Sequence, residues 1–183
     1  MSFQHIEGWL TEDEGLRLES HASQCRELIV EIGSYRGRSS LYIAKGIEGS
    51  TFNPIFYSID PHAGIGVNGH NFDADDLAAC YHNFAAHPEF GQHIRKLVMR
   101  SDQAAPLCEN RSIDMLFVDG DHSYEGVTDD LCRYLPRMKQ GGCVILHDWY
   151  LDSVRTATYQ FDCLVYGDQV DNMKVCGVNH GQS

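Results

Sequence analysis

The amino-acid sequence predicts an α/β fold in which a mainly parallel, seven-stranded sheet carries helices on both faces. Apolar runs of strand length recur along the chain, and segments with helical spacing separate them. Strands that are apolar throughout, rather than alternately apolar and polar, are typical of parallel strands buried on both sides. The two observations together favour a doubly wound domain.

Seven segments are expected as strands. Five are apolar runs that alternate with helical segments, and two shorter runs near the C-terminus complete the sheet. The expected strands are residues 28–33, 55–60, 96–101, 113–120, 143–148, 164–167 and 173–178.

Five helices are expected between these strands, at residues 11–24, 38–46, 74–86, 124–135 and 153–162. The first opens with Thr11 and has Glu14 three positions later, which is the spacing of a capping box. Pro136 and the glycine pair 141–142 are expected to end the fourth helical unit before the next strand begins.

The 183 residues fit one domain. It is expected to consist of an N-terminal helical segment (1–26), a core (27–150) and a C-terminal helix with strands (151–183). Residues 62–73 form a loop rich in glycine and asparagine that is long enough to act as a lid.

Composition excludes several classes of protein. The net charge of −12 disfavours nucleic acid as a partner, because phosphate binding depends on clustered Lys and Arg. No apolar run approaches the roughly 20 residues needed to cross a bilayer, and the N-terminus does not resemble a secretory signal. The seven cysteines are scattered without a CxxC pair, so we expect a cytoplasmic protein with reduced thiols and no membrane partner.

Chemistry is expected where the parallel strands end, because ligands of doubly wound domains bind at the carboxyl edge of the sheet. After the first strand, Gly33 and Gly37 allow tight backbone geometry, and the helix that begins at Arg38 offers free N–H groups to an anion. Their G-x-x-x-G spacing disfavours pyrophosphate binding. Asp60 ends the second strand, where a carboxylate can accept the hydroxyls of a ribose or cap a turn.

Four stretches together resemble the class I S-adenosylmethionine (SAM)-dependent methyltransferases, particularly small-molecule O-methyltransferases of the macrocin and rhamnosyl type. They are EIGSYRG (31–37), SIDP (58–61), DMLFVDGDHSYEGVTDDL (114–131) and GGCVILHDW (141–149). The resemblance covers residues 27–150 and implies a Rossmann-like fold, SAM as cofactor and methyl transfer to an oxygen of a small molecule.

The resemblance also implies roles for individual residues. Cofactor contacts would come from the glycine turn (residues 33–37), the start of the following helix and the ends of later strands. These residues are Glu31, Gly33, Ser34, Tyr35, Gly37, Ser39, Ser40, Asp60, Ser101, Asp102 and Asp119. Ser39 or Ser40 would bind the cofactor carboxylate, Asp60 the ribose, and Ser101 with Asp102 the adenine.

The reaction centre is expected at Asp119, His122 and His147. In metal-dependent members of the resembling group, positions matching Asp119, His147 and Asp148 bind a divalent ion such as Mg²⁺. The middle ligand is usually acidic there. An imidazole at that position suits Zn²⁺, Fe²⁺ or Ni²⁺ better than Mg²⁺, so either the metal differs, His147 serves as a base, or no metal binds. His122 is the other candidate base, since its ordinary pKa lies near neutrality.

The sequence leaves three alternatives open. The Asp119-Gly120-Asp121 sequence could hold the metal of a glycosyltransferase, an arrangement that leaves the glycine turn unused. Cephalosporin-hydroxylase-like oxygenases resemble this sequence at residues 119–122 (DGDH) and 147–148 (HD). A non-catalytic cofactor-binding module is the third. The chain after residue 150 is short and supplies no evident acceptor-binding segment, and a second copy in a homodimer could complete the acceptor site.

Overall fold

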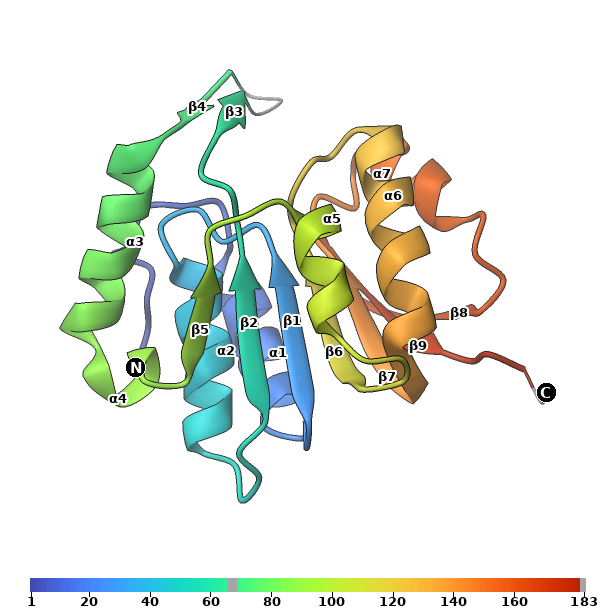
Figure 1. Ribbon diagram of the computed structural model, residues 1–183, viewed down its shortest axis with the longest axis horizontal. Coiled ribbons are helices and arrows are strands. Elements are labelled where there is room, and N and C mark those ends of the chain that lie inside the picture. The colour runs from blue at the N-terminus through green and yellow to red at the C-terminus, as the bar shows by residue number, and fades with distance from the viewer. Residues whose placement is uncertain (66–68, 182–183) are drawn as a thin grey trace.

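The computed structural model describes residues 1–65 and 69–181, and a seven-stranded sheet forms its centre (Figure 1). The strand order is β5-β2-β1-β6-β7-β9-β8. The first five strands in this order pair in parallel, and β9 runs antiparallel between β7 and β8. The strands are β1 (Leu28–Ile32), β2 (Ile55–Ile59), β5 (Ile94–Leu97), β6 (Ile113–Val118), β7 (Met138–Leu146), β8 (Leu164–Val170) and β9 (Met173–Val178).

Helices cover both faces of this sheet, as the sequence predicts (Figure 1). The apolar side chains of α1, α2 and α3 pack on one face, and those of α6 and α7 pack on the other. The helices are α1 (Glu12–Ala22), α2 (Arg38–Glu48), α3 (Ala74–Ala86), α4 (Pro88–Gly91), α5 (Ser101–Ala104), α6 (Tyr124–Tyr134) and α7 (Asp152–Thr158), with 3₁₀ turns at Ala105–Leu107 and Leu135–Arg137.

Two hydrophobic cores result from the alternation of side chains along each strand. Val30 of β1 belongs to the core beneath α6 and α7. Ile29, its neighbour, belongs to the core beneath α1, α2 and α3. Glu31 and His147 have the parity of the second face, so both point toward the α1–α2 layer.

The N-terminus of α1 confirms the predicted capping box. The side chain of Thr11 accepts a hydrogen bond from the backbone N–H of Glu14, and the Glu14 carboxylate accepts one from the N–H of Thr11. The helix therefore begins at Glu12, one residue after its cap. The helix expected at 74–86 has those bounds.

Two expected strands are misplaced. The strand expected at 96–101 lies at Ile94–Leu97, because the chain turns at Arg100 and Ser101 starts α5. The strand expected at 143–148 begins at Met138 and runs through the glycine pair, which the sequence predicted would precede it. The ladder with β6 is irregular there, passing from Ile113–Met138 to Met115–Cys143, so the two glycines fall within an interruption of the pairing.

The loop predicted as a lid contains a short antiparallel hairpin that projects beyond the end of β2 (Figure 1). It pairs β3 (Gly64–Ile65) with β4 (Asn71–Phe72). Residues 66–68 of the predicted lid lie outside the described residues. Within the described ranges, the helices are all too short or too polar to cross a membrane.

Candidate active site

A cavity of about 1140 Å³ opens at the carboxyl ends of β1, β2, β6 and β7. The N-terminal segment Glu7–Leu10 adds a further wall. Ten of the site residues predicted from the sequence line this cavity, namely Gly33, Ser34, Tyr35, Ser39, Asp60, Ser101, Asp119, His122, His147 and Asp148. Four others lie outside the lining: Glu31, Gly37, Ser40 and Asp102.

The glycine turn owes its two glycines to packing within the protein. Gly33 and Gly37 both have positive φ angles, +85° and +87°. A Cβ atom on Gly33 would lie 2.0 Å from the carbonyl oxygen of Asp119, and one on Gly37 would lie 2.5 Å from the ring of Phe84. The sequence predicted close approach of a ligand here. The structure shows close approach of β6 and α3.

Glu31 is fully buried beneath the glycine turn and accepts hydrogen bonds from the hydroxyls of Ser39 (2.6 Å) and Ser40. Burial raises its pKa to about 7, although these hydroxyls favour the charged form. Because both hydroxyls already donate to Glu31, an anion at the start of α2 would meet backbone N–H groups instead. The described side chains leave this N-terminus uncapped.

The side chain of Asp60 holds the backbone of the glycine turn. One carboxylate oxygen accepts the N–H groups of Ser34 (2.8 Å) and Tyr35 (2.9 Å), and the other accepts the N–H of His62 at 2.7 Å. Lys96 of β5 donates to the hydroxyl of Ser34 at 2.6 Å. A ribose at Asp60 would therefore share the carboxylate with the loop.

The expected adenine end contains a residue that the sequence analysis missed. Asp102 pairs with Arg100 at 3.0 Å and lies outside the cavity lining. Asp130 of α6 does line it, and burial raises its pKa to about 6. A signal was present, because Asp130 interrupts the apolar face formed by Val127, Leu131 and Tyr134.

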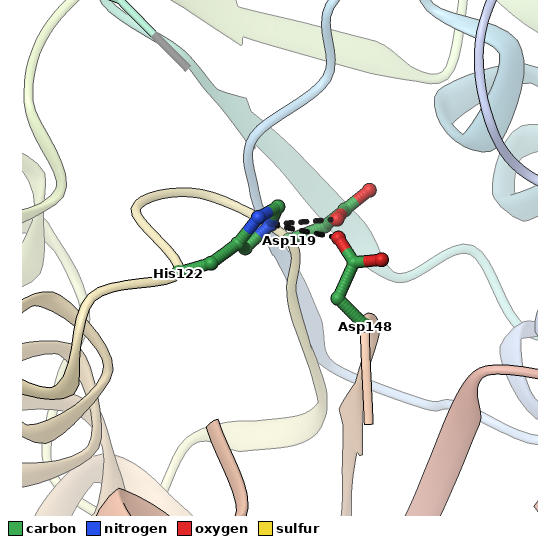
Figure 2. Close-up of side chains that lie close together, drawn as sticks. All are labelled: Asp119, His122 and Asp148. Atoms are coloured by element: carbon green, nitrogen blue, oxygen red, sulfur yellow. Dashed lines mark hydrogen bonds and ion pairs between the residues drawn. The ribbon is translucent and has the colours of Figure 1, made fainter. Parts of the chain in front are cut away.

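The centre of the cavity brings together Asp119, His122 and Asp148 (Figure 2). Nε2 of His122 lies 3.3 Å from Oδ1 of Asp119 and 3.2 Å from Oδ2 of Asp148. Burial opposes the charged form of His122, but the two carboxylates outweigh it and raise the pKa. One ligand atom from each of the three residues lies within 4.8 Å of the others, so the set could hold a metal ion.

His147 lies deeper, between two carboxylates. Its Nδ1 is 3.2 Å from Oδ1 of Asp119, and its Nε2 is 3.3 Å from Oε2 of Glu14. Burial disfavours the imidazolium, yet Asp119, Asp148 and Glu14 together raise the pKa of His147 far above its ordinary value. The same cation, with His122, holds the pKa of Asp119 well below the ordinary value despite burial.

Glu14 reaches this centre from α1, outside the stretch that carries the sequence resemblance. Its carboxylate is fully buried and also accepts the N–H groups of Thr11 and Asn172, both at 2.9 Å. One side chain thus joins the start of α1, the β8–β9 turn and His147. The sequence identified Glu14 only as a capping residue, because no local pattern reports its contact with the end of β7.

Backbone strain is found at two cavity residues. Tyr35 has a φ of +45° and Asp148 a φ of +51°, both in the left-handed region that non-glycine residues rarely adopt. Each such conformation costs on the order of 1–3 kcal/mol and persists only where surrounding contacts impose it. The contacts of Asp60 with Tyr35 and of His122 with Asp148 supply that constraint.

The mouth of the cavity has an aromatic wall, of which the sequence analysis predicted Tyr35 and missed Trp9 and Phe72. Trp9 packs on Tyr35 with a ring-centroid separation of 5.0 Å, and Phe72 of the hairpin lies 5.6 Å from Tyr35. Arg38 fixes the N-terminal segment here by donating to the carbonyl oxygens of Ile6 (2.7 Å) and Leu10 (2.6 Å). Segments far apart in the sequence therefore form one rim.

The geometry does not fit the glycosyltransferase alternative, in which Asp119 and Asp121 would hold one metal ion. Asp121 accepts a hydrogen bond from the N–H of Ser123 at 2.9 Å, at the turn that leads into α6, and packs closely against Gly126. Asp119 instead faces the two histidines. The two aspartates therefore do not converge on one ion.

Comparisons with known proteins agree with this architecture. A family model described as a methyltransferase domain matches residues 30–149. The chain is 25% identical, over 149 residues, to the 8-demethyl-8-(2,3-dimethoxy-alpha-L-rhamnosyl)-tetracenomycin-C 4'-O-methyltransferase of Streptomyces olivaceus, covering 73% of this chain and 57% of that protein. It is 26% identical, over 129 residues, to an uncharacterized protein of Sinorhizobium fredii, covering 70% and 14%. The chain thus spans less than two thirds of both curated relatives.

A solved structure confirms the fold. The O-methyltransferase TomG of Streptomyces achromogenes, determined in complex with SAM, superimposes with a TM-score of 0.70 at 15% identity. The alignment covers 93% of this chain and 82% of TomG. The predicted Rossmann-like α/β fold is therefore correct.

Proposed function

Since the chain belongs to the methyltransferase-domain family, we propose that it transfers a methyl group from SAM to an oxygen atom of a small molecule. One observation carries the proposal: a cavity large enough for cofactor and acceptor together has Asp119, His122 and Asp148 at its centre. The SAM-bound TomG structure and the O-methyltransferase relative support this choice of cofactor and acceptor atom.

Bound SAM would supply an electrophilic methyl group, and its sulfur would keep the electrons of the broken C–S bond. The glycine turn and the uncapped start of α2 would hold its amino-acid part, while Asp60 and Ser101 would hold its nucleoside. Such a reaction depends mainly on positioning and on removing the acceptor proton. The new C–O bond forms as that proton moves to a base of the protein.

We assign the base to His122 rather than His147. Both histidines line the cavity, but 18% of the His122 side chain is exposed against 3% for His147. Both ring nitrogens of His147 already face carboxylates, Nε2 that of Glu14 and Nδ1 that of Asp119, and these raise its pKa. His122 faces the cavity, where Asp119 and Asp148 would stabilise the imidazolium formed as the acceptor loses its proton.

The same residues fit a divalent metal. Asp119, His122 and Asp148 would be its ligands. His147, which the predicted set included, lies deeper, with Nε2 directed at Glu14 and Nδ1 at Asp119, and would support the ligand Asp119 from behind. Two carboxylates with an imidazole suit Fe²⁺, Zn²⁺ or Ni²⁺ better than Mg²⁺. Such an ion would lower the pKa of an acceptor hydroxyl, as an alternative to proton removal by His122.

We further propose a cytoplasmic protein that acts on a free small molecule, without nucleic-acid or membrane partners. The seven cysteines, all within the described ranges, are free thiols, which supports a reducing compartment. A homodimer stays a prediction that the sequence alone suggested. Gel filtration coupled to light scattering would test it.

Calorimetric titration of the purified protein tests the cofactor. SAM, S-adenosylhomocysteine (SAH) and a uridine diphosphate sugar are titrated in turn, each with Mg²⁺, with Ni²⁺ and with chelator. We expect binding of SAM and SAH only, followed by methyl transfer to a hydroxyl compound in a panel assay. Sugar-nucleotide binding alone would contradict the proposal, and SAH binding without transfer to any acceptor would favour the non-catalytic module.

A further inference from the structure

We propose that Lys96 is a positioning residue for cofactor binding, which holds the glycine turn through Ser34 and Asp60. The inference rests on the proposed function and assigns a role to a strand that has no residue in the cavity lining. Lys96 belongs to β5, the edge strand beside β2 (Figure 1). It pairs in register with Ser58.

The contacts of Lys96 form a chain that ends at the cavity wall. Its ammonium donates to the hydroxyl of Ser34 at 2.6 Å. The N–H of Ser34 in turn donates to Asp60 at 2.8 Å, and the N–H of Asp60 donates to the carbonyl of Leu97 in β5 at 3.1 Å. The turn that lines the cavity is thereby fixed to β5 from behind, by a side chain and a backbone bond.

The charge of Lys96 explains why two carboxylates can lie under this turn. Glu31 is fully buried and Asp60 nearly so, with 8% of its surface exposed. Lys96 interacts electrostatically with both and lowers the cost of their burial. Lys96 is half-buried, its ammonium is directed inward to the hydroxyl of Ser34, and burial lowers its pKa. A lysine serving only as packing would place its charged end in solvent.

The chain offers a matched control in Arg95. This residue directly precedes Lys96 in the same strand, is exposed, and points to the opposite face of the sheet. Loss of the Arg95 charge removes one positive charge from the same strand without touching the glycine turn. A difference between the two substitutions therefore reports the contacts of Lys96 and not the net charge of the protein.

The test is a double-mutant cycle with SAH affinity as the readout, measured by calorimetry on wild type, Lys96→Met, Ser34→Ala and the double variant, with Arg95→Met as control. We expect each single substitution to weaken SAH binding about tenfold, the size expected for losing a hydrogen bond to a charged group. The double variant should bind SAH about as weakly as the weaker-binding single variant, because the two residues act through the same series of hydrogen bonds. At saturating SAM, kcat should change less than about twofold, as expected for a loss of binding shared by ground and transition states.

Three outcomes overturn the inference. Unchanged SAH affinity in Lys96→Met, or fully additive effects in the cycle, would overturn it while the proposed function stands. Failure of wild type to bind SAH would overturn both. Should Lys96→Met not fold, Lys96→Gln keeps a donor for Ser34 without the charge, and we expect it to bind SAH with intermediate affinity. Wild-type affinity in that variant would count against a role for the charge.

Amide hydrogen exchange of the ligand-free protein separates positioning from general stability. In Lys96→Gln we expect faster exchange at residues 33–37, with unchanged protection in β1 and β6. Faster exchange spread evenly over the sheet would mean that Lys96 only stabilises the fold.

Discussion

Two ends of the cavity use their carboxylates in opposite ways. At the β1–β2 end, the carboxylates of Glu31 and Asp60 bond to the protein itself. Glu31 accepts from hydroxyls at the start of α2, and Asp60 accepts from backbone N–H groups of the glycine turn. At the β6–β7 end, Asp119 and Asp148 surround histidines that face the cavity, and their side chains keep 25% and 16% exposure. The first end is a frame for the backbone, and the second presents charge to a ligand.

This difference suggests a division of labour. A frame that shapes a loop changes how tightly a ligand is held, without entering the chemistry. Charges and a titratable group that meet the reacting atoms change the rate of the step itself. Substitutions of residues that face the cavity at the β6–β7 end should therefore act on kcat, and those at the β1–β2 end on affinity or stability.

The largest effect is expected from His122→Ala. Loss of a general base typically lowers kcat by about 10²–10⁴-fold. SAH affinity should stay within about threefold of wild type, since the substitution leaves the glycine turn intact. Steady-state assay of methyl transfer and calorimetry measure the two quantities. His82→Ala, an exposed histidine of α3, is the control and should retain both. Equal losses of kcat in His122→Ala and His82→Ala would remove His122 from the mechanism.

Next in size is Glu14→Ala. The substitution leaves the buried His147 with Asp119 and Asp148 but without its partner on Nε2. Removing one member of a buried ion pair costs about 3–5 kcal/mol, which urea unfolding would detect as a lower midpoint. Asp13→Ala, at the exposed neighbouring position, should change stability by less than about 0.5 kcal/mol. A midpoint equal to that of wild type would mean that the contact of Glu14 with His147 does not stabilise the fold.

The sequence predicted which residues reach the carboxyl edge of the sheet better than it predicted the partners of their side chains. Asp60, Asp119 and Asp148 follow apolar runs, and parallel pairing alone carries them to one edge of the sheet. The contact of Glu14 with His147 spans 133 residues and is created by packing of α1 on that sheet. No local sequence pattern predicts such a contact.

Boundary errors in the predicted strands have a similar origin. Val98 and Met99 extend the apolar run of β5, yet Val98 is 45% exposed because the chain has already turned toward α5. Lys96 interrupts the same run, and the sequence gives no sign that its ammonium turns inward to Ser34. Local hydrophobicity predicts that a strand exists, whereas tertiary contacts decide where it stops.

Glu31 makes the frame sensitive to pH. Its pKa is about 7 in the folded protein against 4.5 when unfolded, so the folded state holds a proton that the unfolded state has lost between those values. Stability must then fall as pH rises through this window, by roughly 2–3 kcal/mol between pH 5 and 8. Glu31→Gln should abolish that part of the slope in urea unfolding, whereas Glu89→Gln on the surface should not. Parallel slopes for wild type and Glu31→Gln would show that Lys96 keeps Glu31 ionised.

The smallest effect, and the sharpest division between frame and ligand contact, is expected from Asp60→Asn. The amide keeps one acceptor oxygen for the glycine turn, so SAH binding should weaken only about tenfold. An SAH analogue without ribose hydroxyls then separates two roles of Asp60. A carboxylate that contacts the ribose makes the losses from substitution and analogue overlap, because both remove the same hydrogen bonds. A carboxylate that acts only through Ser34 and Tyr35 makes the two losses add, and Asp60 would then belong wholly to the frame.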